Sequence, residues 1–249
     1  MRRPFGSFSQ LVALMLVLAG DAAASSACKR QSLQDHPVTV CRIDLNRQAL
    51  RLYWKDAADR PYGSLSDIAT RARPQPGRMV FAMNAGMYHD DLSPVGLYVE
   101  NGQTLKKASL AGGAGNFHLL PNGVFYLKGN TGGVMETRRF ARAGIAADHA
   151  TQSGPMLVVD GKLHPKFTGR GQSAKIRNGV GMVDAKTFVF VISEEPVTFT
   201  AFARMFRDDL KARNALYLDG SIPSLYAPSA GRAGRFMPVG PIVGGFDGQ

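Results

Sequence analysis

The order of apolar and polar positions along the chain predicts a protein built mainly from short strands. Segments 37–45 and 50–55 alternate apolar and polar residues, as strands with one buried face do. The runs 79–82 and 215–218 are apolar throughout, which is typical of buried strands. Both runs end in polar, glycine-containing turns, so we expect each to deliver polar side chains to one end of a sheet.

Three dipeptides between apolar segments predict β-hairpins: Asn101-Gly102, Asn122-Gly123 and Asp160-Gly161. Such pairs favour the type I′ turn, because both central residues need a positive φ angle. A further hairpin is expected from segments 180–184 and 187–193. Together these hairpins predict largely antiparallel sheets.

Two segments have the signals of helices. One is short and ends near residue 72, and the other covers residues 199–213 with apolar residues three and four positions apart. The candidate N-caps are Ser64 or Ser66 for the first helix and Thr198 or Thr200 for the second. The predicted fold class is therefore α+β: mixed, largely antiparallel β-sheets with hairpins and a few packed helices, in a single domain.

The N-terminus has the pattern of an export signal. Arg2 and Arg3 precede an apolar run at 11–19 that is too short for an ordinary transmembrane helix. Small residues follow, up to Ala27. We expect residues 1–27 to be a cleavable signal peptide and residues 28–249 to be a periplasmic or secreted domain with no transmembrane segment after cleavage. An uncleaved anchor is the alternative.

The chain has two cysteines, Cys28 and Cys41. An exported chain meets an oxidising compartment, so we expect the two to form a disulfide. Because Cys28 follows the expected cleavage region directly, a lipid-anchored protein acylated at Cys28 stays open as an alternative.

Composition narrows the range of partners. Hydrophobic residues make up 45% of the 249 residues, enough for a core, and the formal net charge is +11. The positive charge favours anionic ligands such as phosphate esters or acidic glycans. Basic residues are scattered and do not interleave with aromatic residues, so we expect no nucleic-acid binding.

Candidate chemistry lies first at the two strand ends. Asn84 supplies a donor and an acceptor, and Asp219 supplies a carboxylate. Gly86 and Gly220 would let the backbone approach a ligand closely. The alternatives are that Asn84 stabilises its own turn and that Asp219 caps a helix or forms a structural ion pair.

The remaining candidate residues each have a functional and a structural interpretation. Ser153 either faces a ligand or makes a turn, and it lacks the G-x-S-x-G pattern of a hydrolase nucleophile. Arg177 either binds a phosphate or carboxylate or is an ordinary surface arginine. Glu194 and Glu195 suit acid–base chemistry or a solvated strand end. The histidines lack metal-ligand spacing, so no metal site is predicted, although a divalent cation held by carboxylate oxygens stays open.

Four segments read together resemble the phosphodiester glycosidase family, of the N-acetylglucosamine-1-phosphodiester α-N-acetylglucosaminidase type, and most closely its small exported bacterial branch. They are NAGMY at 84–88, QSGPMLVVDGKLH at 152–164, KIRNGVG at 175–181 and LYLDGS at 216–221. The resemblance runs from about residue 41 to residue 245. It implies a polar, glycine-rich site where the four segments meet.

The resemblance also implies which residues form that site. The implied catalytic residues are Asp219, Glu194 and Arg177, and the implied substrate-binding residues are Asn84, Gly86, Ser153, Gly154, Arg177, Gly220 and Ser221. One departure is clear: the eukaryotic pattern continues with glycines after the aspartate, whereas this chain has Ile222 and Pro223. The identity of the substrate therefore does not follow from the resemblance.

The implied function is an exported hydrolase that cleaves a sugar-1-phosphodiester or a related envelope glycan without an organic cofactor. Two alternatives remain at this point. One is another glycosidase or phosphodiesterase, and the other is a non-catalytic binding module for anionic glycans.

Overall fold

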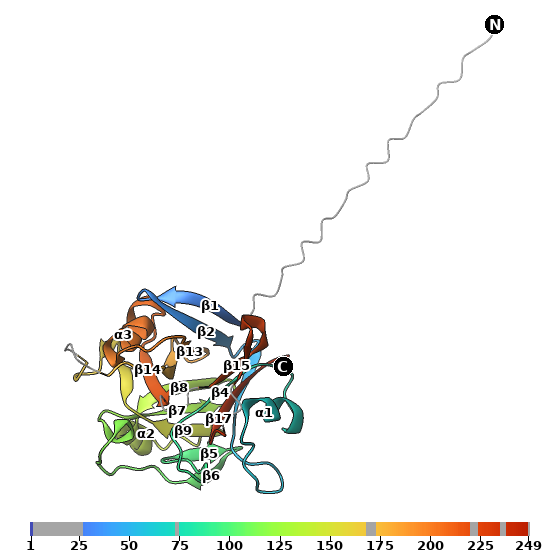
Figure 1. Cartoon of the computed structure of the whole chain (residues 1–249). Coiled ribbons are helices and arrows are strands. Elements are labelled where there is room, and N and C mark those ends of the chain that lie inside the picture. The colour runs from blue at the N-terminus through green and yellow to red at the C-terminus, as the bar shows by residue number, and fades with distance from the viewer. Residues whose placement is uncertain (2–26, 73–74, 168–172, 220–223, 235–237, 249) are drawn as a thin grey trace.

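A computed structural model of the chain describes Met1 and residues 27–248, apart from 73–74, 168–172, 220–223 and 235–237 (Figure 1). Most of the expected signal peptide therefore lies outside the described residues. The expected fold class is confirmed: antiparallel strands dominate, with a few helices, in an α+β arrangement. No helix among the described residues is long and apolar enough to cross a membrane.

The strands form three sheets, and every described strand pair is antiparallel. The seven-stranded sheet has the order β1-β2-β13-β12-β14-β10-β11. Its strands are β1 (Cys28–Leu33), β2 (His36–Asp44), β13 (Thr187–Ser193), β12 (Asn178–Met182), β14 (Asn214–Asp219), β10 (Met156–Val159) and β11 (Lys162–Leu163).

Two five-stranded sheets complete the β-structure. The β4 sheet has the order β16 (Arg232–Ala233), β15 (Leu225–Ala227), β4 (Arg78–Asn84), β17 (Ile242–Asp247) and β3 (Gln48–Tyr53). The β9 sheet has the order β6 (Gln103–Lys106), β5 (Tyr98–Glu100), β9 (His149–Ser153), β7 (Gly123–Lys128) and β8 (Thr131–Glu136).

The three sheets meet in one core because each contributes large apolar side chains to it. Phe81 of β4, Phe125 of β7 and Phe190 of β13 are almost fully buried. The Phe190 ring centroid lies 4.8 Å from that of Phe81 and 5.8 Å from that of Phe125. These contacts hold the strand ends of different sheets in fixed positions relative to one another.

The helices are short and lie on the outside of the sheets (Figure 1). Helix α1 (Leu65–Arg71) begins as predicted, with Ser64 accepting a hydrogen bond from the Asp67 amide. Helix α2 (Thr137–Ala143) was not predicted. Helix α3 (Phe199–Arg204) is capped by Thr198 and continues as one π-helical turn (Met205–Asp209), so the predicted helix 199–213 is too long.

Two of the three expected hairpin turns are confirmed. Asn101 and Gly102 have φ angles of 49° and 77°, and Asp160 and Gly161 have 47° and 78°. The third is wrong: residues 116–118 form a 3₁₀ turn, and β7 pairs with β8 across residues 129–130. The Asn122 amide group instead donates to the Phe117 carbonyl at 2.9 Å, which fixes Asn122 as part of a buried loop.

The expected disulfide between Cys28 and Cys41 is present in the structure. The two residues are direct partners in the β1–β2 register. The bridge therefore fastens the first described strand to the seven-stranded sheet.

Candidate active site

The polar strand ends predicted from the sequence come together where the β4 sheet meets the seven-stranded sheet. Asn84 ends β4, Asn178 begins β12 and Asp219 ends β14. Antiparallel pairing places Asn178 opposite Asp219, and core packing brings β4 against both. All three side chains are buried.

Hydrogen bonds join these three residues into one network. The Asn84 Nδ2 donates to Asp219 Oδ2 at 2.9 Å, and the Asn178 Nδ2 donates to Asn84 Oδ1 at 2.7 Å. The Asp219 amide donates to Asn178 Oδ1 at 2.8 Å, and the Ser224 amide donates to Asn84 Oδ1 at 3.2 Å. The Asn84 amide group thus binds the carboxylate, and Asn178 binds both Asn84 and the main chain of Asp219, so the network joins two sheets. Asn84 is therefore a bridge between sheets and does more than stabilise its own turn.

Ser153 and Gly154 lie at the end of β9, and Gly86, which follows β4, packs against the same strand. The Ser153 hydroxyl donates to the Leu218 carbonyl at 2.8 Å, next to Asp219. A Cβ atom on Gly86 would lie 3.0 Å from Thr151 Oγ1, and one on Gly154 would lie 2.7 Å from the Asn122 Cβ. Both positions are therefore too tightly packed to admit a side chain without rearrangement.

Arg177 is buried, not on the surface, with 1% of its area exposed. Its Nε donates to the Val197 carbonyl at 2.9 Å and its Nη2 to the Ser173 carbonyl at 2.7 Å. The guanidinium stacks on the Phe199 ring, with Cζ 3.6 Å from the centroid. Nη1 is buried and has no hydrogen-bond partner among the described residues.

Glu194 forms an ion pair at the same end of the seven-stranded sheet. Arg232 Nη1 donates to Glu194 Oε2 at 2.6 Å, and the Thr39 hydroxyl donates to Oε1 at 2.5 Å. Glu195 points elsewhere and contacts His36 at 2.6 Å. No contact between Glu194 and Asp219 is seen among the described residues, and Gly220 and Ser221 lie outside them.

The sequence prediction missed three residues of this region. Asn178 was one, and Tyr88 and Tyr217 were the others, although all three lie within the four quoted segments. Burial, with the Asp219 carboxylate as a lesser cause, raises the pKa of Tyr88 to about 12. Burial likewise raises the pKa of Tyr217 to about 12, against the lowering effect of Arg177. Both phenols therefore keep their protons at neutral pH, and the Tyr88 hydroxyl donates a hydrogen bond to the Pro238 carbonyl at 3.2 Å.

Among the described residues, no group of three or more histidine, cysteine, aspartate or glutamate side chains could hold a metal ion. A divalent cation at the site stays an open prediction, to be tested with a chelator.

Comparisons with known proteins place the four segments within one family. The family model for phosphodiester glycosidases matches residues 77–236, which contain all four segments. The uncharacterized protein YigE of Escherichia coli K12 is 36% identical over 207 residues, covering 82% of this chain and 80% of that protein.

Solved structures share the fold at low sequence identity. The catalytic domain of zebrafish N-acetylglucosamine-1-phosphodiester α-N-acetylglucosaminidase, auto-inhibited by its pro-peptide, is similar with a TM-score of 0.63 and 11% identity, over 90% of this chain and 85% of that one. A hypothetical protein from Synechocystis has a TM-score of 0.52 at 17% identity, over 88% of this chain and 61% of that one. The family model and the 36% identical relative, together with the converging motifs, show that this chain belongs to the phosphodiester glycosidase family.

Proposed function

We propose that this protein hydrolyses a sugar-1-phosphodiester at the anomeric carbon. The observation that carries the proposal is the buried Asp219 carboxylate, which accepts a hydrogen bond from Asn84. Asn178 fixes the pair where two sheets meet, because it bonds to Asn84 and to the Asp219 main-chain amide. Glycosidases place carboxylates beside the anomeric carbon to stabilise positive charge or to activate water. Membership of the phosphodiester glycosidase family supports the same class of substrate.

In this proposal Asp219 is the catalytic carboxylate. Its Oδ2 accepts a hydrogen bond from Asn84, which favours one orientation of the carboxylate. Preorganised charge of this kind lowers a barrier without reorganisation during the reaction. Asn84, Gly86, Ser153, Gly154, Gly220 and Ser221 are the proposed lining for the sugar and phosphate oxygens.

Arg177 is the proposed contact for the phosphate. Stacking on Phe199 and two main-chain carbonyls fix the guanidinium, and we assign its buried Nη1, which has no hydrogen-bond partner among the described residues, to the phosphate. The leaving group is a phosphate monoester, whose second pKa is about 6, so it departs with little protonation. The reaction therefore does not need a strong general acid, which suits a site without a histidine among its proposed residues.

The first test measures sugar release by mass spectrometry from a panel of sugar-1-phosphodiesters, with and without EDTA. Asp219→Asn keeps an acceptor for Asn84 but removes the charge, so turnover should fall by roughly 100-fold or more. Glu194→Gln is the matched carboxylate variant. Its turnover should fall less than that of Asp219→Asn, because Glu194 is paired with Arg232. Near-normal turnover in Asp219→Asn would remove this residue from the chemistry.

The same panel separates the alternatives. Aryl glycosides lack the phosphate that Arg177 is proposed to hold, so preferential cleavage of these would favour another glycosidase. Saturable binding of glycosyl phosphates without any product would favour a binding module. Loss of activity in EDTA, restored by one divalent cation, would establish the cation dependence that the sequence leaves open.

We further propose that the protein acts in the periplasm or after secretion. The Cys28–Cys41 disulfide suits an oxidising compartment. A structural relative with a TM-score of 0.50 and 12% identity, over 85% of this chain and 74% of that one, is described as a putative exported protein of Burkholderia pseudomallei. Sequencing the N-terminus of the protein from its natural host would test cleavage after Ala27 and show whether Cys28 carries lipid.

A further inference from the structure

A pocket lies at the opposite end of the β9 sheet from the candidate active site. Strand β9 runs from His149, which lines this pocket, to Ser153, which contacts Leu218 beside Asp219. Four residues of strand separate the two by about 13 Å, given a rise of about 3.3 Å per residue. The pocket is therefore distinct from the Asn84–Asp219 network.

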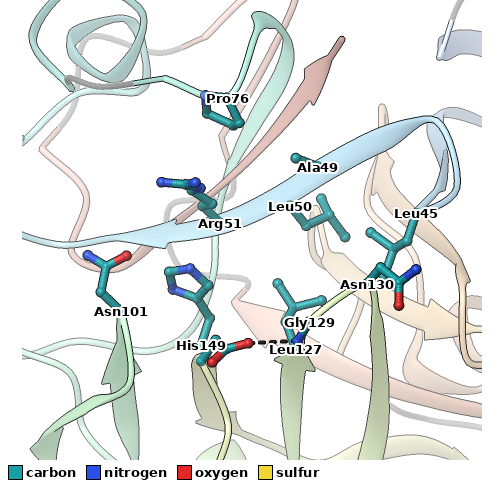
Figure 2. Close-up of a pocket in the computed structure, with 11 residues that line it drawn as sticks. Leu45, Ala49, Leu50, Arg51, Pro76, Asn101, Leu127, Gly129, Asn130 and His149 are labelled. Carbon is teal, nitrogen blue, oxygen red and sulfur yellow. Dashed lines mark hydrogen bonds between the residues drawn. The ribbon is translucent and has the colours of Figure 1, made fainter. Parts of the chain in front are cut away.

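The pocket has the size of a small-molecule site. Its volume is about 500 Å³, within the range of roughly 300–1,000 Å³ that is usual for ligand sites. Leu45, Leu50 and Leu127 give it an apolar lining, and the edge strand β3 crosses it (Figure 2). Loop and turn residues Asn101 and Asn130 also line it.

Arg51 supplies the cationic group of the pocket. It projects from β3, while His149 and Asn101 come from the elements beneath that strand (Figure 2). Arg51 makes no side-chain hydrogen bond or ion pair with any described residue. Its guanidinium offers five N–H donors, which match the paired oxygens of a carboxylate or phosphate.

His149 lies beside Arg51 and is also incompletely bonded. It is 7% exposed, and its Nδ1 has no hydrogen-bond partner among the described residues. Burial, with the Arg51 charge as a lesser cause, lowers the pKa of His149 to about 4. The ring is therefore neutral at pH 7 and adds no second positive charge, which leaves Arg51 as the group that selects an anion.

The remaining polar groups of the pocket determine which other groups of the ligand can bind beside its anionic group. Asp148 Oδ2 accepts from the Gly129 amide at 2.7 Å, which fixes the carboxylate in the pocket wall. A second anionic group placed there would be repelled, whereas hydroxyl groups would find acceptors in Asp148, Asn101 and Asn130. The lining thus combines one cationic donor with several acceptors for hydroxyl donors.

We propose that this pocket binds an anionic sugar, with the sugar's carboxylate or phosphate on Arg51 and its hydroxyls on Asp148, Asn101 and Asn130. The site is separate from the proposed catalytic centre, and it would hold a second part of a glycan or a free sugar acid. The expected ligand has one carboxylate or phosphate group and several hydroxyl groups. The proposal does not depend on catalytic activity.

The test is binding of three probes to the full-length protein: glucuronate, glucose 6-phosphate and unmodified glucose. Titration calorimetry gives the affinities, and histidine side-chain NMR, with His149 assigned from a His149→Gln variant, reports the location. We expect saturable binding of at least one anion, a shift of the His149 signals, and no comparable binding of glucose. Which anion binds more tightly distinguishes a carboxylate source from a phosphate source.

Two matched variants separate this pocket from the catalytic centre. Arg51→Gln should weaken binding of the anion by roughly tenfold or more, as expected for loss of a charge-assisted hydrogen bond. Asp219→Asn should leave binding and the His149 shift unchanged. Failure of both anions to bind, equal binding of glucose, or binding that Arg51→Gln leaves intact would each overturn the proposal. An inactive enzyme that still binds the anion would count only against the proposed function.

Discussion

At the scale of single residues, Glu100 shows how burial changes the chemistry of a carboxyl group. Its Oε2 accepts from the Tyr98 hydroxyl at 2.9 Å and from the Trp54 amide at 3.1 Å. Burial nevertheless raises the pKa of Glu100 from 4.5 to about 7, because the surrounding aromatic side chains disfavour the charged form. Near neutral pH the group therefore titrates inside the fold.

This shift predicts a pH dependence with a definite sign. A pKa that is higher in the folded state stabilises the fold below pH 4.5, and that contribution is lost as the pH rises through 7. Its upper bound is about 3.5 kcal/mol, since one pKa unit corresponds to about 1.4 kcal/mol. Glu100→Gln keeps an acceptor for both hydrogen bonds and does not ionise.

The measurement is the free energy of unfolding by urea at pH 5 and pH 8 in both proteins. We expect Glu100→Gln to be more stable than the wild type at pH 8 and nearly equal to it at pH 5. His149 is present in both proteins, so its contribution to the pH dependence of the free energy of unfolding cancels in the comparison. Parallel pH profiles would contradict the assignment of a raised pKa to Glu100.

At the scale of elements, strand β17 depends on a glycine that the sequence pattern gave no reason to single out. Gly245 lies in the middle of the β4 sheet, where β17 pairs with both β3 and β4. A Cβ atom at this position would overlap the Phe81 ring, which is buried in the core shared by the three sheets. The missing side chain is therefore a packing requirement.

Gly245→Ala should destabilise the protein by about 1–3 kcal/mol, the usual cost of overpacking a core. Gly112→Ala is the matched control, because a Cβ atom at Gly112 meets no atom within 4 Å and its φ angle is not positive. That change should stay within about 0.5 kcal/mol. Urea denaturation of both variants checks the difference, and equal stabilities would show that Phe81 moves aside freely.

At the scale of the whole molecule, the Cys28–Cys41 disulfide ties an edge strand to the rest of the fold. Among the described strands, β1 pairs with β2 alone, and the Ser229 hydroxyl also donates to the Cys28 carbonyl at 3.3 Å. Without the bridge, β1 is held by these hydrogen bonds and by packing. The bridged residues are separated by 13 positions in the chain. Closing a loop of this length restricts the unfolded chain and is worth about 3 kcal/mol in the chain-entropy model.

The double variant Cys28→Ser, Cys41→Ser should lose about that free energy of unfolding. Its effect should be matched by the wild type in a strong reductant, which serves as the control for the serine substitutions. Denaturant midpoints with and without reductant give both values. If reduction leaves the midpoint unchanged, the bridge adds nothing to stability.

The sequence by itself determined much of the local structure. Alternating and continuous apolar runs predicted β2, β3, β4, β13 and β14 within a few residues, because these patterns follow directly from which strand faces are buried. Asn101-Gly102 and Asp160-Gly161 form the predicted turns because their preference for positive φ angles is local. The four motifs are also sufficient to indicate the family, and the family model confirms it.

Tertiary structure decided the rest, because it depends on contacts between residues far apart in the chain. Asn122 has the local preference of a turn residue, but the bond to Phe117 places it in a buried loop. Asn178 is an ordinary strand residue until the pairing of β12 with β14 puts it between Asn84 and Asp219. Arg177 and His149 are likewise defined by burial that no sequence pattern shows. The sequence thus determined which residue types are available, and packing of three sheets decided which of them meet.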